Sequence, residues 1–167
     1  KALSAVEDLL TDAESRVRAE AAAGLIRCGG PEASRRAWPV LMEMVSSEDT
    51  ETRITAARAV GQVGSKEFTE MGRVGRINPE HPVNPCSLDF QGLLLKLLRD
   101  NVAAVRVAAL RAAEEVTCPE AIPVIVQMLA EDRMYEAAAH ALVTYGDEVV
   151  EPLRQATSSP QPGGAPG

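Results

Sequence analysis

Hydrophobic residues recur along this chain at the spacing of one face of an α-helix. In the segment that starts at Val17, apolar or small side chains return after four residues and again after eight, and charged groups lie between them. A stripe with this spacing predicts an amphipathic helix that buries one face. Related segments start at Thr52, Val105 and Met134. The pattern therefore predicts four related helices.

The four segments align without gaps. They read VRAEAAAGLIRCG, TRITAARAVGQVG, VRVAALRAAEEVT and MYEAAAHALVTYG. Arginine holds the second place in three of them, and alanine holds the fifth place in all four. Three segments close on glycine, at Gly29, Gly64 and Gly146, where a residue with positive φ is expected after a helix.

A second apolar segment precedes each of these helices across an acidic or polar turn. These segments read AVEDLL, AWPVLMEMV, LLLKLL and AIPVIVQML, and a fifth, EVVEPLRQA, follows Gly146. Pro39, Pro123 and Pro152 stand near three of the predicted helix starts, where proline is tolerated because the first N–H groups have no acceptor within the helix. One helical hairpin cannot bury its apolar stripe alone, so the hairpins are expected to stack. The predicted fold is all-α, a right-handed α-solenoid of about four to five hairpins.

The repeated string resembles the HEAT repeat, and in particular the short bacterial form of phycobilisome-lyase-type proteins. The resemblance rests on the polar turn, the Val-Arg step, the paired alanines and the closing Leu-Gly, and it covers residues 2–156 apart from an insertion. It implies that the arginine after the first residue pairs with an aspartate of a neighbouring unit. The arginines concerned are Arg18, Arg53 and Arg106, and the expected partners are Asp12, Asp49, Asp100 or Asp132.

In HEAT arrays the second helix of each unit lines the concave face, which the resemblance makes the candidate binding surface. The in-phase row Ala23, Arg58, Arg111 and His140 would set two guanidiniums and an imidazole along a groove. Arginine binds carboxylates through paired hydrogen bonds, so this row predicts an acidic or helical peptide as the partner. The competing interpretation is a solvated face without a ligand. The candidate protein-binding residues are Glu20, Arg27, Thr55, Arg58, Gln62, Arg111, Glu115, His140 and Thr144.

An insertion over residues 65–91 interrupts the repeat. Its three central prolines forbid a regular helix, and insertions of this kind leave one face of a solenoid and often carry recognition. Its candidate binding residues are Arg73, Arg76 and His81, with a plain surface loop as the default interpretation. The phenylalanines that bracket the insertion are expected to anchor its ends to the core.

Composition narrows the class of protein. Alanine accounts for 26 of the 167 residues and aromatic residues for only 3 %, which favours helices and disfavours a β-sandwich or barrel. The 17 basic and 24 acidic side chains give a formal net charge of −7, the wrong sign for binding a nucleic-acid backbone. No apolar run reaches the length of a membrane span. We expect a HEAT-like array over residues 1–157 and a disordered Pro/Gly-rich tail or linker over residues 158–167.

The cysteines and histidines do not assemble a metal or catalytic site. Cys28, Cys86 and Cys118 lack zinc-site spacing and are expected to be reduced thiols of a cytoplasmic protein, two of them buried and Cys86 in the loop. His81 lies in a proline-rich loop and His140 in mid-helix, neither beside a nucleophile. No catalytic residue, metal or cofactor is predicted.

The predicted function is therefore a non-catalytic module for protein interaction, scaffolding or regulation. Because the chain begins at Lys1, we expect it to be part of a larger protein, for example a transporter- or signalling-associated domain on the cytosolic side of a membrane. The resemblance implies one alternative, a bilin lyase or lyase subunit acting on phycobiliproteins. The expected partner is a protein or acidic peptide, without nucleic acid, and weak self-association is expected through uncapped terminal repeats.

Overall fold

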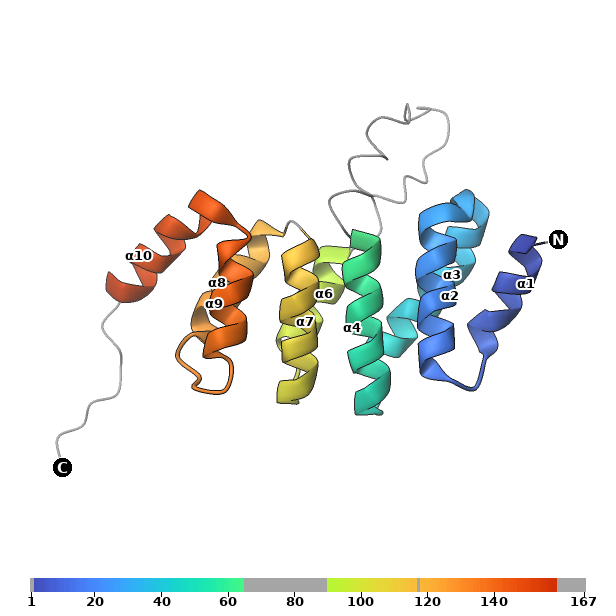
Figure 1. Cartoon of the computed structure of the whole chain (residues 1–167), viewed down its shortest axis with the longest axis horizontal. Coiled ribbons are helices and arrows are strands. Elements are labelled where there is room, and N and C mark those ends of the chain that lie inside the picture. Colours follow the sequence, from blue (N-terminus) through green and yellow to red (C-terminus); the bar gives the residue numbers. More distant parts are fainter. Residues whose placement is uncertain (1, 65–89, 117, 159–167) are drawn as a thin grey trace.

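Two layers of helices make up the protein (Figure 1). The computed structural model describes residues 2–64, 90–116 and 118–158, and all regular elements in these ranges are helical. One layer holds the first helix of each hairpin, called here the A helix: α1 (Ala2–Asp8), α3 (Gly30–Val45), α6 (Phe90–Leu98), α8 (Ile122–Met128) and α10 (Val150–Ser158). The other layer holds the B helices α2 (Ser15–Cys28), α4 (Thr50–Gly64), α7 (Ala103–Glu115) and α9 (Tyr135–Val143). Short 3₁₀ helices, η1 (Leu9–Thr11), η3 (Pro119–Ala121) and η4 (Gly146–Val149), join some of them.

The B helices form one continuous row. Helix α2 contacts α4, α4 contacts α7, and α7 contacts α9, as Figure 1 shows. Each B helix also packs on the A helix of its own hairpin, so every apolar stripe is covered by neighbours on two sides. This arrangement confirms the predicted all-α solenoid. The hairpins are numbered here as units 1 (α1, α2), 2 (α3, α4), 3 (α6, α7) and 4 (α8, α9).

Polar side chains in the turns begin the B helices. Asp49 Oδ2 accepts hydrogen bonds from the amide and the hydroxyl of Thr52, at 2.8 and 2.6 Å. Asp12 and Asp100 each accept a bond from the amide two residues further on, both at 2.8 Å. These bonds satisfy N–H groups that have no acceptor inside the helix.

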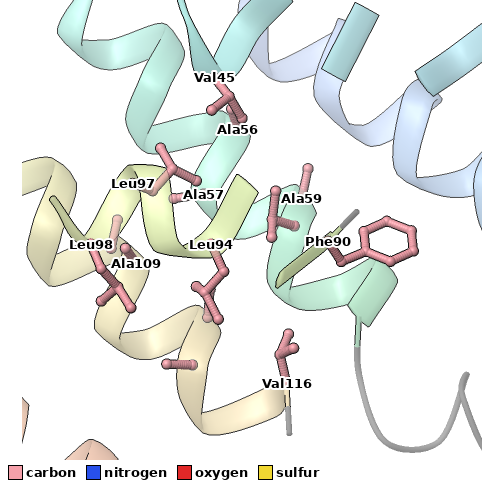
Figure 2. Packing of buried hydrophobic residues seen from close by; sticks show 14 of the residues in the cluster. Val45, Ala56, Ala57, Ala59, Phe90, Leu94, Leu97, Leu98, Ala109 and Val116 are labelled. Carbon is pink, nitrogen blue, oxygen red and sulfur yellow. The ribbon is translucent and has the colours of Figure 1, made fainter. Parts of the chain in front are cut away.

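The core between α4, α6 and α7 is built from leucine, valine and alanine, as Figure 2 shows. Two glycines of α4 lie against α7 and the residue that follows it. A Cβ atom on Gly61 would lie 3.0 Å from Cα of Ala112, and one on Gly64 would lie 2.6 Å from a methyl group of Val116. The small residues that repeat in the sequence therefore set the distance between neighbouring units.

Two of the three predicted helix-ending glycines behave differently from the prediction. Gly146 has the expected positive φ of 58°. At the end of α2 the positive φ of 78° belongs to Gly30, and Gly29 has a φ of −79°. Gly64 is the last residue of α4 and is kept small by its contact with α7. Gly64 is therefore a glycine because of close packing, and not because the chain needs a positive φ there.

The proline prediction was wrong at one position. Helix α3 begins at Gly30, with Pro31 in its first turn, and Pro39 lies inside the helix. Pro39 is exposed, so the carbonyl that loses its intrahelical partner is at the solvent side of the A layer. Pro123 is in the first turn of α8 and Pro152 is the third residue of α10, as predicted.

The described residues define one end of the predicted insertion. Phe90 and Gln91 belong to α6, so the expected loop over 65–91 was too long by two residues. The Phe90 ring packs edge to face on Trp38, with 4.9 Å between ring centroids, and thereby anchors this end to the core. Ser158, expected to open the tail, is the last residue of α10. The other insertion residues, including Arg73, Arg76 and His81, and the tail over 159–167 lie outside the described residues.

Candidate functional site

In units 1 and 2 the repeated arginine ties the B helix to the turn before it. Arg18 donates from Nη1 to the carbonyl oxygens of Asp12 and Ala13, at 2.7 and 3.0 Å. Arg53 donates in the same way to the carbonyl oxygens of Ser47 and Glu48, at 2.8 and 2.9 Å. This role was not predicted, although the equal spacing between each of these arginines and its turn in the sequence contains the signal.

Arg53 also makes the ion pair between units that the resemblance implied. Its Nε and Nη2 donate to the two carboxylate oxygens of Asp100, at 2.7 and 3.2 Å, and both side chains are nearly buried, at 11 and 12 % exposed. Burial by itself raises the pKa of Asp100, but hydrogen bonds from Arg53 and from the Val102 amide outweigh it and hold that pKa below its usual value. The pair joins units 2 and 3 and defines their register.

Arg18 does not make the expected pair. In the observed pair, the partner of Arg53 is Asp100, which stands six residues before Arg106, the repeated arginine of unit 3. Ser47 holds that place before Arg53, so unit 2 has no carboxylate at the position equivalent to Asp100. Within the described residues Arg18 takes part in no ion pair. The serine is the physical reason for the failed prediction.

Arg106 finds a different carboxylate from the one expected. It pairs with Glu131 through Nη2 at 2.5 Å, because the residue six places before Tyr135 is Leu129. Its Nε is buried and has no hydrogen-bond partner among the residues that the structure describes. Asp132, the expected partner, forms no ion pair within the described part of the chain.

Three of the four residues in the predicted binding row lie on the surface. Arg58 on α4, Arg111 on α7 and His140 on α9 are exposed on three adjacent B helices. His140, at 74 % exposed, places Nδ1 2.9 Å from a carboxylate oxygen of Glu114, whereas the two arginines take part in no ion pair with the described residues. Ala23 was wrongly assigned to this row, since it is 1 % exposed and packs in the core.

Some of the remaining candidate residues make hydrogen bonds within the protein, and others are exposed to solvent. Gln62 donates to Glu20 at 3.4 Å, linking α4 to α2. The hydroxyls of Thr55 and Thr144 each donate to a carbonyl of their own helix, at 2.8 and 2.7 Å, which leaves them less suited to a ligand. Arg27 and Glu115 are exposed.

A comparison with known families agrees with the observed repeat. The model for HEAT repeats matches residues 3–71 and 91–164. The chain belongs to the HEAT-repeat family. Two engineered proteins of known crystal structure resemble this HEAT array: one has 24 % identity and a TM-score of 0.59 over 94 % of this chain and 68 % of the other, and one has 21 % identity and a TM-score of 0.60 over 95 % and 70 %. At these identities the likeness concerns the fold alone. No curated protein matches the sequence.

The cysteines of the HEAT array lie in two different environments. Cys28, expected to be buried, is exposed at the end of α2 because the helix turns this position away from α3 and α4. Cys118 is buried, and burial raises the pKa of its thiol to about 11, so the group is a neutral thiol at physiological pH. Cys86 lies outside the described residues.

Across residues 2–64, 90–116 and 118–158, no group of three or more potential metal-ligating His, Cys, Asp or Glu side chains comes together. Among the helices described, none combines the length and apolarity that crossing a bilayer requires.

Proposed function

We propose that this HEAT array is a non-catalytic module that binds an acidic segment of a partner protein along its B helices. The observation that carries the proposal is the pair Arg58 and Arg111, exposed on adjacent helices and joined to no carboxylate among the described residues. A guanidinium in this state can bind a carboxylate through two parallel hydrogen bonds.

The spacing of the helices matches an extended peptide. Packed helices lie about 8–10 Å apart, and an extended chain in the polyproline II conformation advances about 3.1 Å per residue with three residues per turn. Acidic side chains three residues apart on such a segment point the same way and would therefore meet Arg58 and Arg111 in turn. Arg27 on α2 provides a further exposed guanidinium on the same row of helices.

Charge on the rest of the molecule limits the kind of partner. The net charge of −7 repels long polyanions at a distance, so the two arginines favour a short acidic segment that reaches them directly over a nucleic acid. The proposed module needs no cofactor and does not span a membrane. It would act in the cytoplasm or at the cytosolic side of a larger protein.

The C-terminal end supports weak self-association. Tyr135 and Val143 of α9 are 56 and 78 % exposed, and Val150 of α10 is 51 % exposed. These apolar side chains lie at the last described hairpin of the array, where a further repeat would pack in a longer solenoid. Dimer formation that rises with protein concentration in sedimentation and weakens in Val143→Glu would support this part of the proposal.

Peptide binding tests the main proposal. The probes are a fluorescent peptide with glutamate at every third position and its glutamine counterpart, measured by anisotropy with the whole chain. The double variant Arg58→Glu/Arg111→Glu is compared with Arg99→Glu/Arg133→Glu, which changes the charge equally at exposed turn residues. We expect a loss of at least about tenfold in affinity for the first double variant only.

Other outcomes decide against the proposal. Equal binding of the glutamate and glutamine peptides would show that carboxylates are not recognised. Equal losses in both double variants would reduce the effect to net charge. A stoichiometric bilin bound by the protein would instead favour a lyase.

A further inference from the structure

A pocket opens at the junction between units 1 and 2, away from the candidate row on the B helices. Its volume is about 450 Å³, and it lies among η1, the start of α2, the end of α3 and the turn before α4. Leu10, Val40 and Met44 form an apolar wall, and Arg18, Glu43 and Ser47 contribute polar groups. We call this cavity the junction pocket.

Between units 1 and 2, the junction pocket occupies the position that the Arg53–Asp100 ion pair occupies between units 2 and 3. Arg53 uses Nη1 for its own turn and turns Nε and Nη2 to the carboxylate of Asp100. Arg18 uses Nη1 in the same way, but the residue equivalent to Asp100 is Ser47. None of the described groups accepts a hydrogen bond from Nε or Nη2 of Arg18. A guanidinium held in place by its turn thus lines a cavity with its carboxylate-binding edge unused.

We propose that the junction pocket binds the C-terminal residue of a peptide, through its carboxylate and an apolar side chain. The carboxylate takes the place on Arg18 that Asp100 takes on Arg53, and the Ser47 hydroxyl donates a second bond. The apolar side chain lies against Leu10, Val40 and Met44.

The negative charge of Glu43 favours a single carboxylate over a multiply charged anion as the ligand of the junction pocket. Glu43 lines the same pocket, so a phosphate or another multiply charged anion is repelled more strongly than a single carboxylate, and the side chain can accept a hydrogen bond from a peptide N–H. A single carboxylate beside an amide and an apolar side chain is the chemistry that satisfies all three kinds of lining group. This site does not depend on the function proposed for Arg58 and Arg111.

The proposal is tested by NMR titration of the whole ¹⁵N-labelled chain with N-acetyl-leucine and with its amide, N-acetyl-leucinamide. We expect saturable shifts of the amides around Thr11, Ser47 and Thr52 with the acid, and binding at least about tenfold weaker with the amide. Equal shifts with both compounds, or no saturable shift at millimolar acid, overturn the proposal. Free leucine binding as tightly as N-acetyl-leucine overturns the assignment to a peptide end.

Two variants separate the pocket from general effects. Ser47→Asp supplies Arg18 with the carboxylate that it lacks, so binding of N-acetyl-leucine should be lost while the melting temperature rises. Ser47→Asn has a similar size without the charge and should retain at least part of the binding. Undiminished binding in Ser47→Asp contradicts the proposal. The double variant Arg58→Glu/Arg111→Glu should bind N-acetyl-leucine normally, which distinguishes failure of the pocket from failure of the proposed function.

Discussion

The junctions on either side of α4 are built from the same repeat and differ in how they close. Between units 2 and 3, glycines let α4 approach α7, and Arg53 and Asp100 form a nearly buried ion pair. Between units 1 and 2, a serine replaces the aspartate and a pocket of about 450 Å³ remains beside Arg18. One residue in a turn thus determines whether the repeated arginine joins two units or faces a cavity.

This difference matters because a solenoid is stabilised junction by junction. Each unit contacts only its neighbours, so a weak junction is not compensated by distant contacts. A buried ion pair contributes more to register than to net stability, but removing one partner leaves an uncompensated charge. We therefore expect unit 1 to separate from the array more readily than unit 3 separates from unit 2.

The largest effect is expected from Arg53→Gln. This variant leaves Asp100 nearly buried without its partner and should lower the free energy of unfolding by about 3 kcal/mol. Arg18→Gln loses the equivalent turn bonds but no ion pair, and should cost about 1 kcal/mol. Urea unfolding followed by circular dichroism measures both. Equal losses would show that the turn bonds, which both arginines make, account for the effect and that the ion pair does not distinguish the junctions.

A leucine at Gly61 tests the close approach of α4 to α7. The added side chain meets the backbone of Ala112, so we expect a loss of about 2 kcal/mol through overpacking. Gly24→Leu in α2 is the matched control, because a Cβ there meets nothing within 4 Å. A similar loss in both variants would contradict the difference in packing.

Acid should weaken the junction between units 2 and 3. The pKa of Asp100 in the folded protein lies below its value in the unfolded chain, so the unfolded state binds the proton first. The stabilisation is present above about pH 4, the pKa of an unperturbed aspartate, and is lost as the pH falls through the folded-state pKa. The difference in unfolding free energy between the wild type and Asp100→Asn should therefore shrink below this pH. A difference that does not change between neutral and acid pH would refute the assignment.

The smallest effect is a gain, expected from Gly24→Ala. Gly24 lies in mid-helix on an exposed part of α2, with open space around its Cβ position. Alanine should add about 0.5–1 kcal/mol by reducing the flexibility of the unfolded chain. The same change at Gly61 crowds Ala112 and should give no gain. Thermal unfolding of the two variants side by side measures the contrast.

Much of the architecture could be predicted because it is encoded locally. The spacing of Val17, Thr52, Val105 and Met134 located all four B helices, and the repeat predicted that they stack. The pair between Arg53 and a neighbouring aspartate was implied by the resemblance to HEAT repeats. These features depend on residues at regular places, which a sequence shows directly.

The missed features depend on which surfaces meet. Ala23 and Cys28 are both small residues of α2, yet one is buried and the other exposed because the stripe facing α3 and α4 includes only the first. The partners of Arg18 and Arg106 were mistaken because the turns differ in length and in the residue placed opposite. Binding by Arg58 and Arg111 stays a prediction.

The sequence by itself determined that this chain forms stacked helical hairpins, because the period of its apolar residues and its many small residues permit little else. Only the tertiary structure decided what each repeated residue does. An arginine at one repeat position is part of a buried ion pair in unit 2 and lines a cavity in unit 1. The physical reason is that the partner of a side chain comes from another unit, at a distance and angle that a linear pattern does not contain.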